Sequence, residues 1–411
     1  MKSTLGLRIE LPQTPEDLSY TLLCVCKGLF HKQQYTPCKL APSGKCHLRI
    51  VLSFHFKYTS PPGGIFMAKM KAVIFKKHGS TAELEAAYVP IPEIGKKDVL
   101  VKVKACALNH LDLWTLGGLP GIKISMPHIL GCDIAGEVVE KGKKAHGIPL
   151  HKPVIVAPGI SCGNCSYCES GWDSLCAKYE IIGFQNNGGY AGYVKVPARN
   201  IIPVTGKWGM ESWAAVPLAF LTAWHVLVTR ATLQKKETVL IQAGGSGIGS
   251  AAIQIAKLLG ARVITTVGSE EKVKRAKALG ADDIINYRLK DFQTEVMRLT
   301  RGEGVDVLFD HIGGDTFTKS VLCLKKRGRI VTCGATAGRT VSFDLRYLFT
   351  HQLSVIGSYM GGIAELKRIV RRIEDGRLKP VLDQVFPLRE ARQALNRMAN
   401  RENFGKIILK P

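Results

Sequence analysis

The sequence predicts an α/β fold built on a doubly wound parallel sheet, and three observations lead to this prediction. Thr238–Ile241 is a short run of apolar, β-prone residues, and it continues directly into a glycine-rich turn. A helical pattern follows this turn, and a second β-prone run begins a few residues later. Strand-like and helix-like segments then alternate as far as Gly357, an arrangement typical of parallel sheets that are covered by helices.

The elements of this sheet can be assigned in order along the chain. The helix after the turn has one apolar face, because its apolar residues recur at spacings of four, three and four: Ile248, Ala252, Ile255 and Leu259. The strands expected after it are Arg262–Val267, a short strand just before Tyr287, Val305–Phe309, Arg329–Thr332 and Leu353–Gly357. Ligands of such a sheet are expected at the carboxyl ends of the strands.

Length and composition exclude several classes of protein. The chain has 411 residues, of which 46% are hydrophobic and 22% charged, and this fits two or three globular domains. The longest apolar run, Val216–Val228, contains Thr222 and His225 and is shorter than the roughly 18–20 residues of a membrane helix. Integral membrane, collagen-like and disordered proteins are therefore excluded, and no membrane partner is expected.

Basic residues outnumber acidic ones but are scattered along the chain. Lys and Arg total 57 against 33 Asp and Glu, a formal net charge of +24. The basic residues form only short groups such as Lys325–Arg327, and no basic stripe with interleaved aromatic residues is present. We therefore expect a solvated surface and a small-molecule partner rather than a nucleic-acid site.

The distribution of the twelve cysteines indicates one metal cluster in a reducing compartment. Four cysteines precede residue 50, four lie between Cys162 and Cys176, and four are isolated. A secreted disulfide framework is smaller and denser in cysteine than this chain. A cytoplasmic location is therefore expected.

The first 66 residues differ from the rest of the chain, since they show neither helical nor strand periodicity. Their cysteines, at positions 24, 26, 38 and 46, have spacings that match no common zinc module, so free thiols are expected there. A mitochondrial transit peptide is one interpretation of this basic, acid-poor segment. The other is that residues 1–66 are not native coding sequence: the codons of Gly63 and Gly64 can spell a ribosome-binding sequence, with translation starting at Met67 or Met70.

The glycine-rich turn predicts a dinucleotide site. Gly244, Gly245, Ser246, Gly247, Ile248 and Gly249 lie between the first strand and its helix. Residues without side chains allow a pyrophosphate to approach the backbone, and the anion then lies on the free N–H groups at the positive end of the helix. Gly249 allows close packing of the helix on the strand.

The next turn indicates which cofactor is bound. An NAD site usually places an acidic residue at the end of the second strand, where it binds the ribose 2′-hydroxyl. Here that strand ends in Val267, Gly268 and Ser269, and the first acidic residue is Glu270. Lys272 and Arg288, which follows Tyr287, supply cations nearby, so we predict NADP(H). The alternative is that Lys272 is an ordinary exposed lysine.

Four closely spaced cysteines predict a structural zinc ion. Cys162, Cys165, Cys168 and Cys176 follow the pattern C-x2-C-x2-C-x7-C. Four thiolates close a tetrahedron around zinc and leave no position for substrate, so such an ion stabilises a loop instead of performing catalysis. An iron–sulfur cluster is the alternative, but the spacing lacks the ferredoxin pattern.

The chain from Met70 to Pro411 resembles the medium-chain dehydrogenase/reductase superfamily, in its zinc-binding alcohol dehydrogenase and quinone oxidoreductase branch. The resemblance rests on the cysteine lobe, the glycine-rich turn, and the strings at residues 108–114, 127–133, 221–224 and 403–406. It implies a GroES-like, β-rich substrate domain (67–215 and 355–411, with the zinc lobe at 160–178) and a Rossmann domain at 216–354. It also implies a nicotinamide cleft between them and a homodimer or homotetramer.

The sequence departs from the alcohol dehydrogenases of that family at their catalytic zinc. The three ligand positions fall on Asn109, on Cys132 within Gly131-Cys132-Asp133, and on Leu218. A catalytic zinc needs about three protein ligands and an open position. Leu218 cannot bind metal, so we expect no catalytic zinc and expect Cys132 to be a small buried apolar residue. A metal site at Cys132 is the alternative.

Without a Lewis acid, the oxidation of an alcohol is difficult, whereas a quinone or an α,β-unsaturated carbonyl delocalises the incoming charge itself. By resemblance to the quinone oxidoreductases, Gly268, Lys272 and Tyr287 hold the 2′-phosphate, with Ser269 in the same turn. Ser246 and Gly247 hold the pyrophosphate. Thr222 lies beside the nicotinamide, Asn109 is polar in the cleft, and Asp112 orients the loop.

We therefore predict an NADPH-dependent reductase of quinones or enones, with catalytic residues Asn109, Asp112 and Thr222. Two further residues, His110 and Tyr359, are candidates to face the cleft. The alternatives are a zinc-dependent alcohol or aldehyde dehydrogenase, and a non-catalytic NADPH- or RNA-binding protein.

Overall fold

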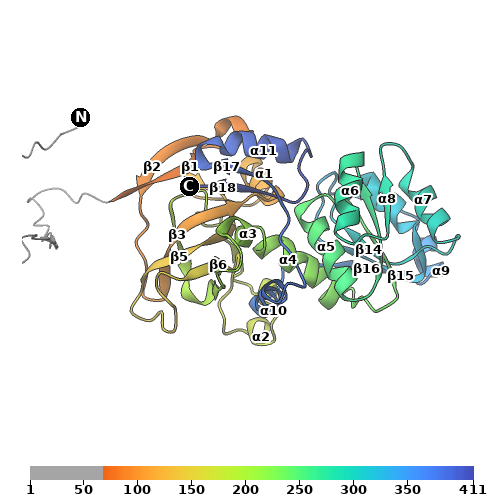
Figure 1. Cartoon of the computed structure of the whole chain (residues 1–411), viewed down its shortest axis with the longest axis horizontal. Coiled ribbons are helices and arrows are strands. Elements are labelled where there is room, and N and C mark those ends of the chain that lie inside the picture. Colours follow the sequence, from red (N-terminus) through yellow and green to blue (C-terminus); the bar gives the residue numbers. More distant parts are fainter. Residues whose placement is uncertain (1–67) are drawn as a thin grey trace, which may run out of the picture. The chain divides into compact units, whose positions relative to one another are not determined.

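A six-stranded parallel sheet forms the second half of the molecule in the computed structural model, which describes residues 68–411 (Figure 1). Its strand order is β13-β12-β11-β14-β15-β16, so the first strand in sequence lies in the middle and the chain winds outward on both sides. The strands are β11 (Thr238–Ile241), β12 (Arg262–Val267), β13 (Asp283–Asn286), β14 (Val305–Asp310), β15 (Leu324–Thr332) and β16 (Ser354–Gly357). The predicted fold class is thereby confirmed.

Alternate residues of these strands enter two different cores. Val239 and Ile241 of β11 join the core that contains α4 (Pro217–Trp224), α5 (Gly247–Leu258) and α10 (Ile363–Glu374). Leu240 faces the opposite side, with α7 (Phe292–Leu299) and α8 (Gly314–Val321). Both faces of the sheet are therefore buried, as continuous apolar strands require. The remaining helices of this half are α6 (Glu270–Ala278) and α9 (Leu345–Thr350).

The first half of the described chain is β-rich. A seven-stranded sheet has the order β10-β6-β5-β3-β18-β17, with β9 also paired to β3. Its strands are β3 (Asp98–Ala107), β5 (Asp133–Lys141), β6 (Pro153–Val156), β9 (Tyr193–Pro197), β10 (Ile201–Pro203), β17 (Leu382–Pro387) and β18 (Lys406–Lys410). Because β17 and β18 come from the end of the described chain, this sheet joins residues that are far apart in sequence.

Smaller elements surround this sheet. Three further strands form a second sheet in the order β2-β1-β4: β1 (Lys69–Phe75), β2 (Glu85–Pro90) and β4 (His128–Ile129). A short two-stranded sheet pairs β7 (Gly159–Ile160) with β8 (Glu180–Ile181). The helices are α1 (His110–Gly117), α2 (Ser166–Glu169), α3 (Met210–Ala214) and α11 (Ala391–Ala399).

The apolar run 216–228 is a buried helix of the core. It forms α4 and continues into a π-helix, His225–Arg230, and most of its residues are buried. Within residues 68–411, no helix has the length and apolar character needed to cross a bilayer. The expected domain boundaries at 66, 215 and 354 stay a prediction, and residues 1–66, with their four cysteines, lie outside the described part.

Candidate active site

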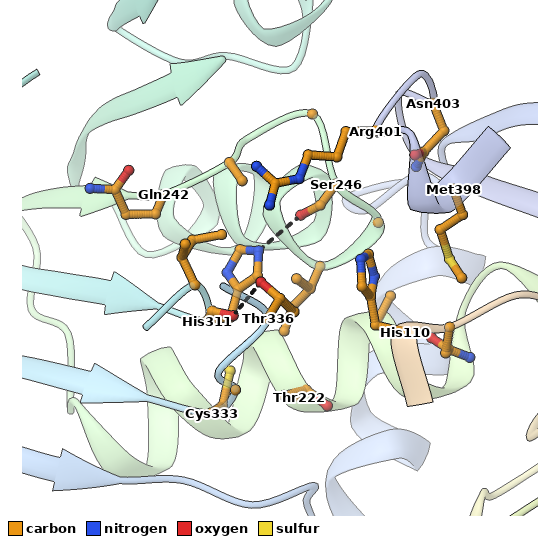
Figure 2. Close-up of a pocket in the computed structure, with 18 of the residues that line it drawn as sticks. His110, Thr222, Gln242, Ser246, His311, Cys333, Thr336, Met398, Arg401 and Asn403 are labelled. Carbon is orange, nitrogen blue, oxygen red and sulfur yellow. Dashed lines mark hydrogen bonds between the residues drawn. The ribbon is translucent and has the colours of Figure 1, made fainter. Parts of the chain in front are cut away.

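A cavity of about 920 Å³ lies where the carboxyl ends of the parallel strands meet the β-rich half (Figure 2). Residues at the end of β12 and residues that directly follow β11, β14 and β15 line it on one side, and residues from α1, α4 and the segment 398–407 line it on the other. This position agrees with the rule that open parallel sheets bind ligands at the carboxyl ends of their strands. One end of the cavity is polar and the other apolar.

The glycine-rich turn forms the floor of the polar end. Gly245, Ser246, Gly247 and Ile248 line the cavity, and the Ser246 Oγ caps α5 by accepting a hydrogen bond from the Gly249 N–H at 2.9 Å. The first N–H groups of a helix have no partner inside the helix, so they are available to an anion.

The other two glycines of the turn support it from behind and do not line the cavity. A Cβ at Gly244 would lie 2.2 Å from the Thr265 Oγ1, and one at Gly249 would lie 2.3 Å from the Ala243 carbonyl oxygen. Both positions therefore have room only for glycine, because Gly244 packs against β12 and Gly249, in α5, packs against the turn after β11.

The segment before β18 closes the turn from above. The Gly405 N–H donates to the Gly245 carbonyl at 2.9 Å. The aliphatic part of Lys406 lies so close to Gly247 that a Cβ there would be 2.5 Å from the Lys406 Cδ. The turn is thus held between the parallel sheet and the β-rich half.

The end of β12 supplies a cationic corner. Gly268, Lys272 and Tyr287 line the cavity there, and the Tyr287 hydroxyl lies against Gly268. The Lys272 Nζ donates to the Arg401 carbonyl at 2.6 Å, and burial lowers the Lys272 pKa from its ordinary value. Glu270 does not line the cavity, and its carboxylate accepts a hydrogen bond from the Asn286 Nδ2 at 2.9 Å.

Ser269 does not have the position expected for a cofactor ligand. It does not line the cavity, and its hydroxyl caps α6 by accepting a hydrogen bond from the Lys272 N–H. Its side chain therefore shapes the turn that carries Lys272 instead of lining the site.

Two histidines face the polar end from opposite sides, with Arg401 above Ser246 (Figure 2). His110 was a candidate from the sequence, whereas His311 was missed. The His311 Nε2 lies 3.4 Å from the Ser246 Oγ, and its Nδ1 is buried without a partner. Burial, and then the nearby His110, lower the His311 pKa to about 4, so the ring is neutral at neutral pH. The position of His311 after β14 is the signal that could have identified it.

Apolar side chains form the other end of the cavity, which we call the acceptor pocket. Its lining includes Leu111, Trp114, Leu119, Ile122, Ile181, Phe184, Leu218, Tyr359 and Met360. Thr222, on α4, lines the cavity near this end and is 8% exposed. Tyr359 therefore faces the cleft, as its candidacy from the sequence suggested.

A buried polar network lies under the acceptor pocket. The Lys406 ammonium lies 2.9 Å from the Asp133 carboxylate, and it donates to the Asn109 Oδ1 at 2.6 Å and to the Leu108 carbonyl. The Asn109 Nδ2 donates to the Asp133 Oδ2 at 3.0 Å, with the Cys132 Sγ 3.3 Å away. Charge and hydrogen-bond partners are balanced here, as burial of an ion pair demands.

Asp112 is placed to orient this network and not to touch a substrate. It does not line the cavity, and its place among the catalytic residues stays a prediction. Its Oδ2 accepts hydrogen bonds from the Asn109 N–H at 2.7 Å and from the Tyr190 hydroxyl at 2.8 Å. Burial raises the Asp112 pKa to about 6.

The residues around Cys132 do not fit a catalytic zinc. Cys132 belongs to an apolar cluster with Ile181, Phe184 and Met360, and Leu218 packs against it. The nearest carboxylate, Asp133, is already bound to Lys406, Asn109 and the Leu218 N–H. Burial, followed by the charges of Asp133 and Asp112, raises the Cys132 pKa well above its ordinary value and so favours the protonated thiol.

The four-cysteine lobe, residues 160–178, does fit a zinc ion. The Sγ atoms of Cys162, Cys165, Cys168 and Cys176 all lie within 4.8 Å of one another. Four thiolates at this separation can surround a zinc ion with Zn–S distances of about 2.3 Å. Among residues 68–411, this is the single group of three or more His, Cys, Asp or Glu side chains arranged for metal binding.

Two protein-family models match the chain. A model described as the alcohol dehydrogenase GroES-like domain matches residues 95–206, and one described as a zinc-binding dehydrogenase matches residues 247–375. Together they cover most of the β-rich half and most of the parallel sheet.

Relatives and solved structures span the same region. An NAD-dependent alcohol dehydrogenase of Sulfolobus acidocaldarius is 32% identical over 348 residues, which cover 83% of this chain and 99% of the relative. A crotonyl-CoA reductase of Streptomyces avermitilis is 30% identical over 365 residues, covering 79% of this chain and 81% of the relative. A crystal structure of an NAD-dependent alcohol dehydrogenase is 43% identical, with a TM-score of 0.80, and covers 83% of this chain and all of its own.

Proposed function

This chain belongs to the medium-chain dehydrogenase/reductase superfamily, and from that premise we propose that it is an NADPH-dependent reductase of α,β-unsaturated carbonyl compounds or quinones. The superfamily membership makes it an oxidoreductase. The observation that carries the finer proposal is the acceptor pocket, where Leu218 and Asn109 occupy two of the three positions that a catalytic zinc would need.

An apolar pocket without a metal suits an acceptor that stabilises its own charge. Hydride addition to a conjugated carbonyl or a quinone delocalises the new electron pair onto oxygen, so the protein mainly has to align the reactants. The similarity to a crotonyl-CoA reductase supports this substrate class. Bound NADPH would supply the hydride, and the apolar lining would keep water away from it.

The residues of the polar end would hold the cofactor. The first turn of α5 offers its N–H groups to the pyrophosphate, with Arg401 above Ser246 and His110 on the other side of the cavity. Lys272 and Tyr287 would hold the 2′-phosphate, and the absence of a lining carboxylate at the end of β12, within the described chain, supports NADPH over NADH. Thr222 would lie beside the nicotinamide.

Two further parts of the proposal concern the metal and the assembly. The four-cysteine lobe would hold one structural zinc, which would stabilise a loop with little core of its own. A homodimer is expected, and α9 and the edge strand β16 offer apolar side chains for it, including Leu345, Phe349 and Val355. A cytoplasmic location stays a prediction.

One observation favours an alcohol dehydrogenase as the second candidate. The solved structure that is 43% identical to this chain is described as an NAD-dependent alcohol dehydrogenase. That function would require a metal site at Cys132 with ligands that the neighbouring residues do not supply.

A substrate panel with both coenzymes separates these functions. We expect reduction of enones, enoyl thioesters or quinones with NADPH, about one zinc per chain, and little oxidation of alcohols. Alcohol oxidation together with about two zinc ions per chain would support the second candidate instead. Binding of RNA with no turnover would contradict both.

The coenzyme assignment is tested by Lys272→Ala. Loss of a charged partner of the 2′-phosphate should raise the KM for NADPH about tenfold and leave the KM for NADH nearly unchanged. Lys274→Ala is the matched control, because Lys274 is exposed on the same helix and does not line the cavity. Equal effects on both coenzymes would remove the assignment.

A further inference from the structure

The wall of the acceptor pocket contains a segment with an unfavourable backbone conformation. Tyr359 and Met360 line the cavity, and Met360 has a φ of 56°. A side chain larger than glycine rarely adopts this left-handed conformation, and it persists only where neighbouring contacts fix it. The contacts that fix Met360 therefore decide the shape of this wall.

Two carboxylates hold the backbone just after this segment, where α10 begins. The Glu365 Oε2 accepts a hydrogen bond from the Gly362 N–H at 2.9 Å. The Asp173 Oδ2 accepts one from the Ile363 N–H at 3.1 Å. Asp173 belongs to the four-cysteine lobe, where it lies between Cys168 and Cys176, and only 7% of it is exposed. The first residues of α10 are therefore fixed by two acceptors, Glu365 within the helix and Asp173 in the four-cysteine lobe.

The lobe also lies directly against the neighbouring helices. A Cβ at Gly362 would be 2.6 Å from the Gly171 carbonyl oxygen, so the two backbones touch. The Trp172 ring meets the His225 ring edge-on, with centroids 5.5 Å apart, and the Arg230 guanidinium lies 5.7 Å from the Trp172 ring. Figure 1 shows α2 of the lobe beside α10.

Glu365 connects these contacts to the helix that carries Thr222. Its carboxylate also accepts hydrogen bonds from the His225 Nδ1, at 2.9 Å, and from the Thr229 hydroxyl, both in the π-helix that continues α4. Although burial raises the Glu365 pKa, the hydrogen bonds from His225 and Thr229 outweigh this effect and hold it below the ordinary value. One ionised side chain thus joins α4, α10 and the turn at Gly362.

From this geometry we propose that Glu365 and Asp173 are positioning residues, which fix the Tyr359–Met360 wall of the acceptor pocket and couple it to the four-cysteine lobe. The lobe then has a second role beyond its own stability, because its docking determines how well the pocket fits the acceptor. The proposal rests on the proposed function for the identity of the pocket's ligand, whereas the clamp on Gly362 and Ile363 can be tested without any substrate.

The test uses Glu365→Gln in the full-length protein. A glutamine presents one oxygen and an NH2 group to three donors, so at least one donor loses its acceptor. We expect the KM for the acceptor to rise about fivefold to tenfold, as loss of a hydrogen bond to a charged group produces. We expect the KM for NADPH and the zinc content to stay unchanged, and kcat to fall by less than about threefold.

Hydrogen exchange supplies the readout that needs no turnover. In Glu365→Gln, the amides of residues 357–365 should exchange about fivefold to tenfold faster than in the wild type, the same factor as the expected rise in the KM for the acceptor. The matched control is Glu211→Gln, which breaks the pair between Glu211 and Lys410 on a surface away from the cavity. It should change neither the exchange of this segment nor the KM for the acceptor.

Two further variants keep the proposal open to refutation. Asp173→Asn, on the lobe side, should also raise the KM for the acceptor and speed the exchange of residues 357–365. Thr229→Val removes one donor from Glu365 and should produce smaller changes in both quantities. It replaces Glu365→Gln as the test if that variant fails to fold. Unchanged exchange at 357–365 would overturn the proposal, as would equal changes in the KM values of acceptor and coenzyme. If the wild type reduces no acceptor, the proposed function fails. The hydrogen-exchange result still shows whether Glu365 and Asp173 hold the backbone at Gly362 and Ile363.

Discussion

Two cysteine-containing regions of this molecule differ in what surrounds their sulfur atoms. In the four-cysteine lobe, four Sγ atoms lie within 4.8 Å of one another. At the base of the acceptor pocket, Cys132 lies among Ile181, Phe184 and Met360, and Leu218 packs against this cluster. The first region is arranged for metal binding and the second for apolar contact.

The difference shows that a region binds metal when enough ligand side chains lie close together. A single cysteine is not sufficient. The lobe draws all its donors from a stretch of 15 residues, so their spacing in the sequence already indicates the site. Around Cys132, the ligand positions that the family resemblance implies come from three separate segments, and two of them, Asn109 and Leu218, carry side chains that cannot replace a thiolate. The following predictions test this comparison.

The largest effect is expected from Cys168→Ser. Removal of one of four ligands should abolish zinc binding, and the free energy of unfolding should fall on the order of 3 kcal/mol or more, because metal binding contributes directly to folding. Metal analysis and urea unfolding measure both quantities. Cys323→Ala, at a buried cysteine outside the lobe, should keep the zinc and lose only about 1 kcal/mol. A variant that kept both its zinc and its stability would refute the assignment of the lobe.

Adding metal-binding side chains near Cys132 tests whether the number of donors decides metal binding. Asn109→Cys combined with Leu218→Cys places two more thiols beside Cys132, so the metal content should rise from about one to about two ions per chain. Leu218→Cys alone, with only two thiols at the site, should leave the content unchanged. A double variant that still binds one ion would mean that the number of donors is not what separates the two regions.

The buried carboxyl group of Asp112 should make the free energy of unfolding depend on pH. Burial raises the Asp112 pKa from 3.8 to about 6, so folding favours the protonated form. Asp112 should therefore reduce the stability by on the order of 2–3 kcal/mol as the pH rises from about 4 through about 6, and by nothing further above that range.

Asp112→Asn provides the measurement for this pH effect. The asparagine does not titrate, and its oxygen can still accept from the Asn109 N–H and the Tyr190 hydroxyl. Its stability relative to the wild type should therefore increase between about pH 4 and pH 6 in urea unfolding and stay nearly level above that. A difference that stays constant across this range would show that Asp112 is ionised throughout.

The smallest effect is expected from Cys132→Ala. Removal of one buried sulfur leaves a small cavity, so the free energy of unfolding should fall by about 1–2 kcal/mol, with unchanged zinc content. Reduction of the acceptor should stay within about threefold of the wild-type rate. Loss of a metal ion or of all activity would instead indicate a catalytic metal at Cys132.

The parallel sheet could be predicted closely from the sequence because its signals are local. β11 and β12 have the predicted bounds, since each is a short run rich in β-branched residues that ends at a turn. β15 begins at Leu324, earlier than expected, because the charged residues 325–327 hide the start of the strand. The seven-stranded sheet gives no comparable local signal, since it pairs β3 with β18.

The site was predictable only in part, for the same reason. Residues 245–248 of the glycine-rich turn, Lys272 and Tyr287 follow the strand ends and line the cavity. Arg401 reaches the cavity from a loop whose position depends on the β-rich half, so no local pattern indicates it. Ser269 and Asp112 carry suitable chemical groups, but local capping turns their side chains to other partners.

The pairing of β18 with β3 has a consequence for how the protein assembles during translation. Lys406 meets the Leu108 carbonyl across 298 residues of sequence, whereas the parallel sheet uses only the contiguous stretch from 238 to 357. On the ribosome, the half that is synthesised later can therefore be completed first. The half that is synthesised earlier waits for its last strand, and its exposed sheet edge is where a chaperone would act.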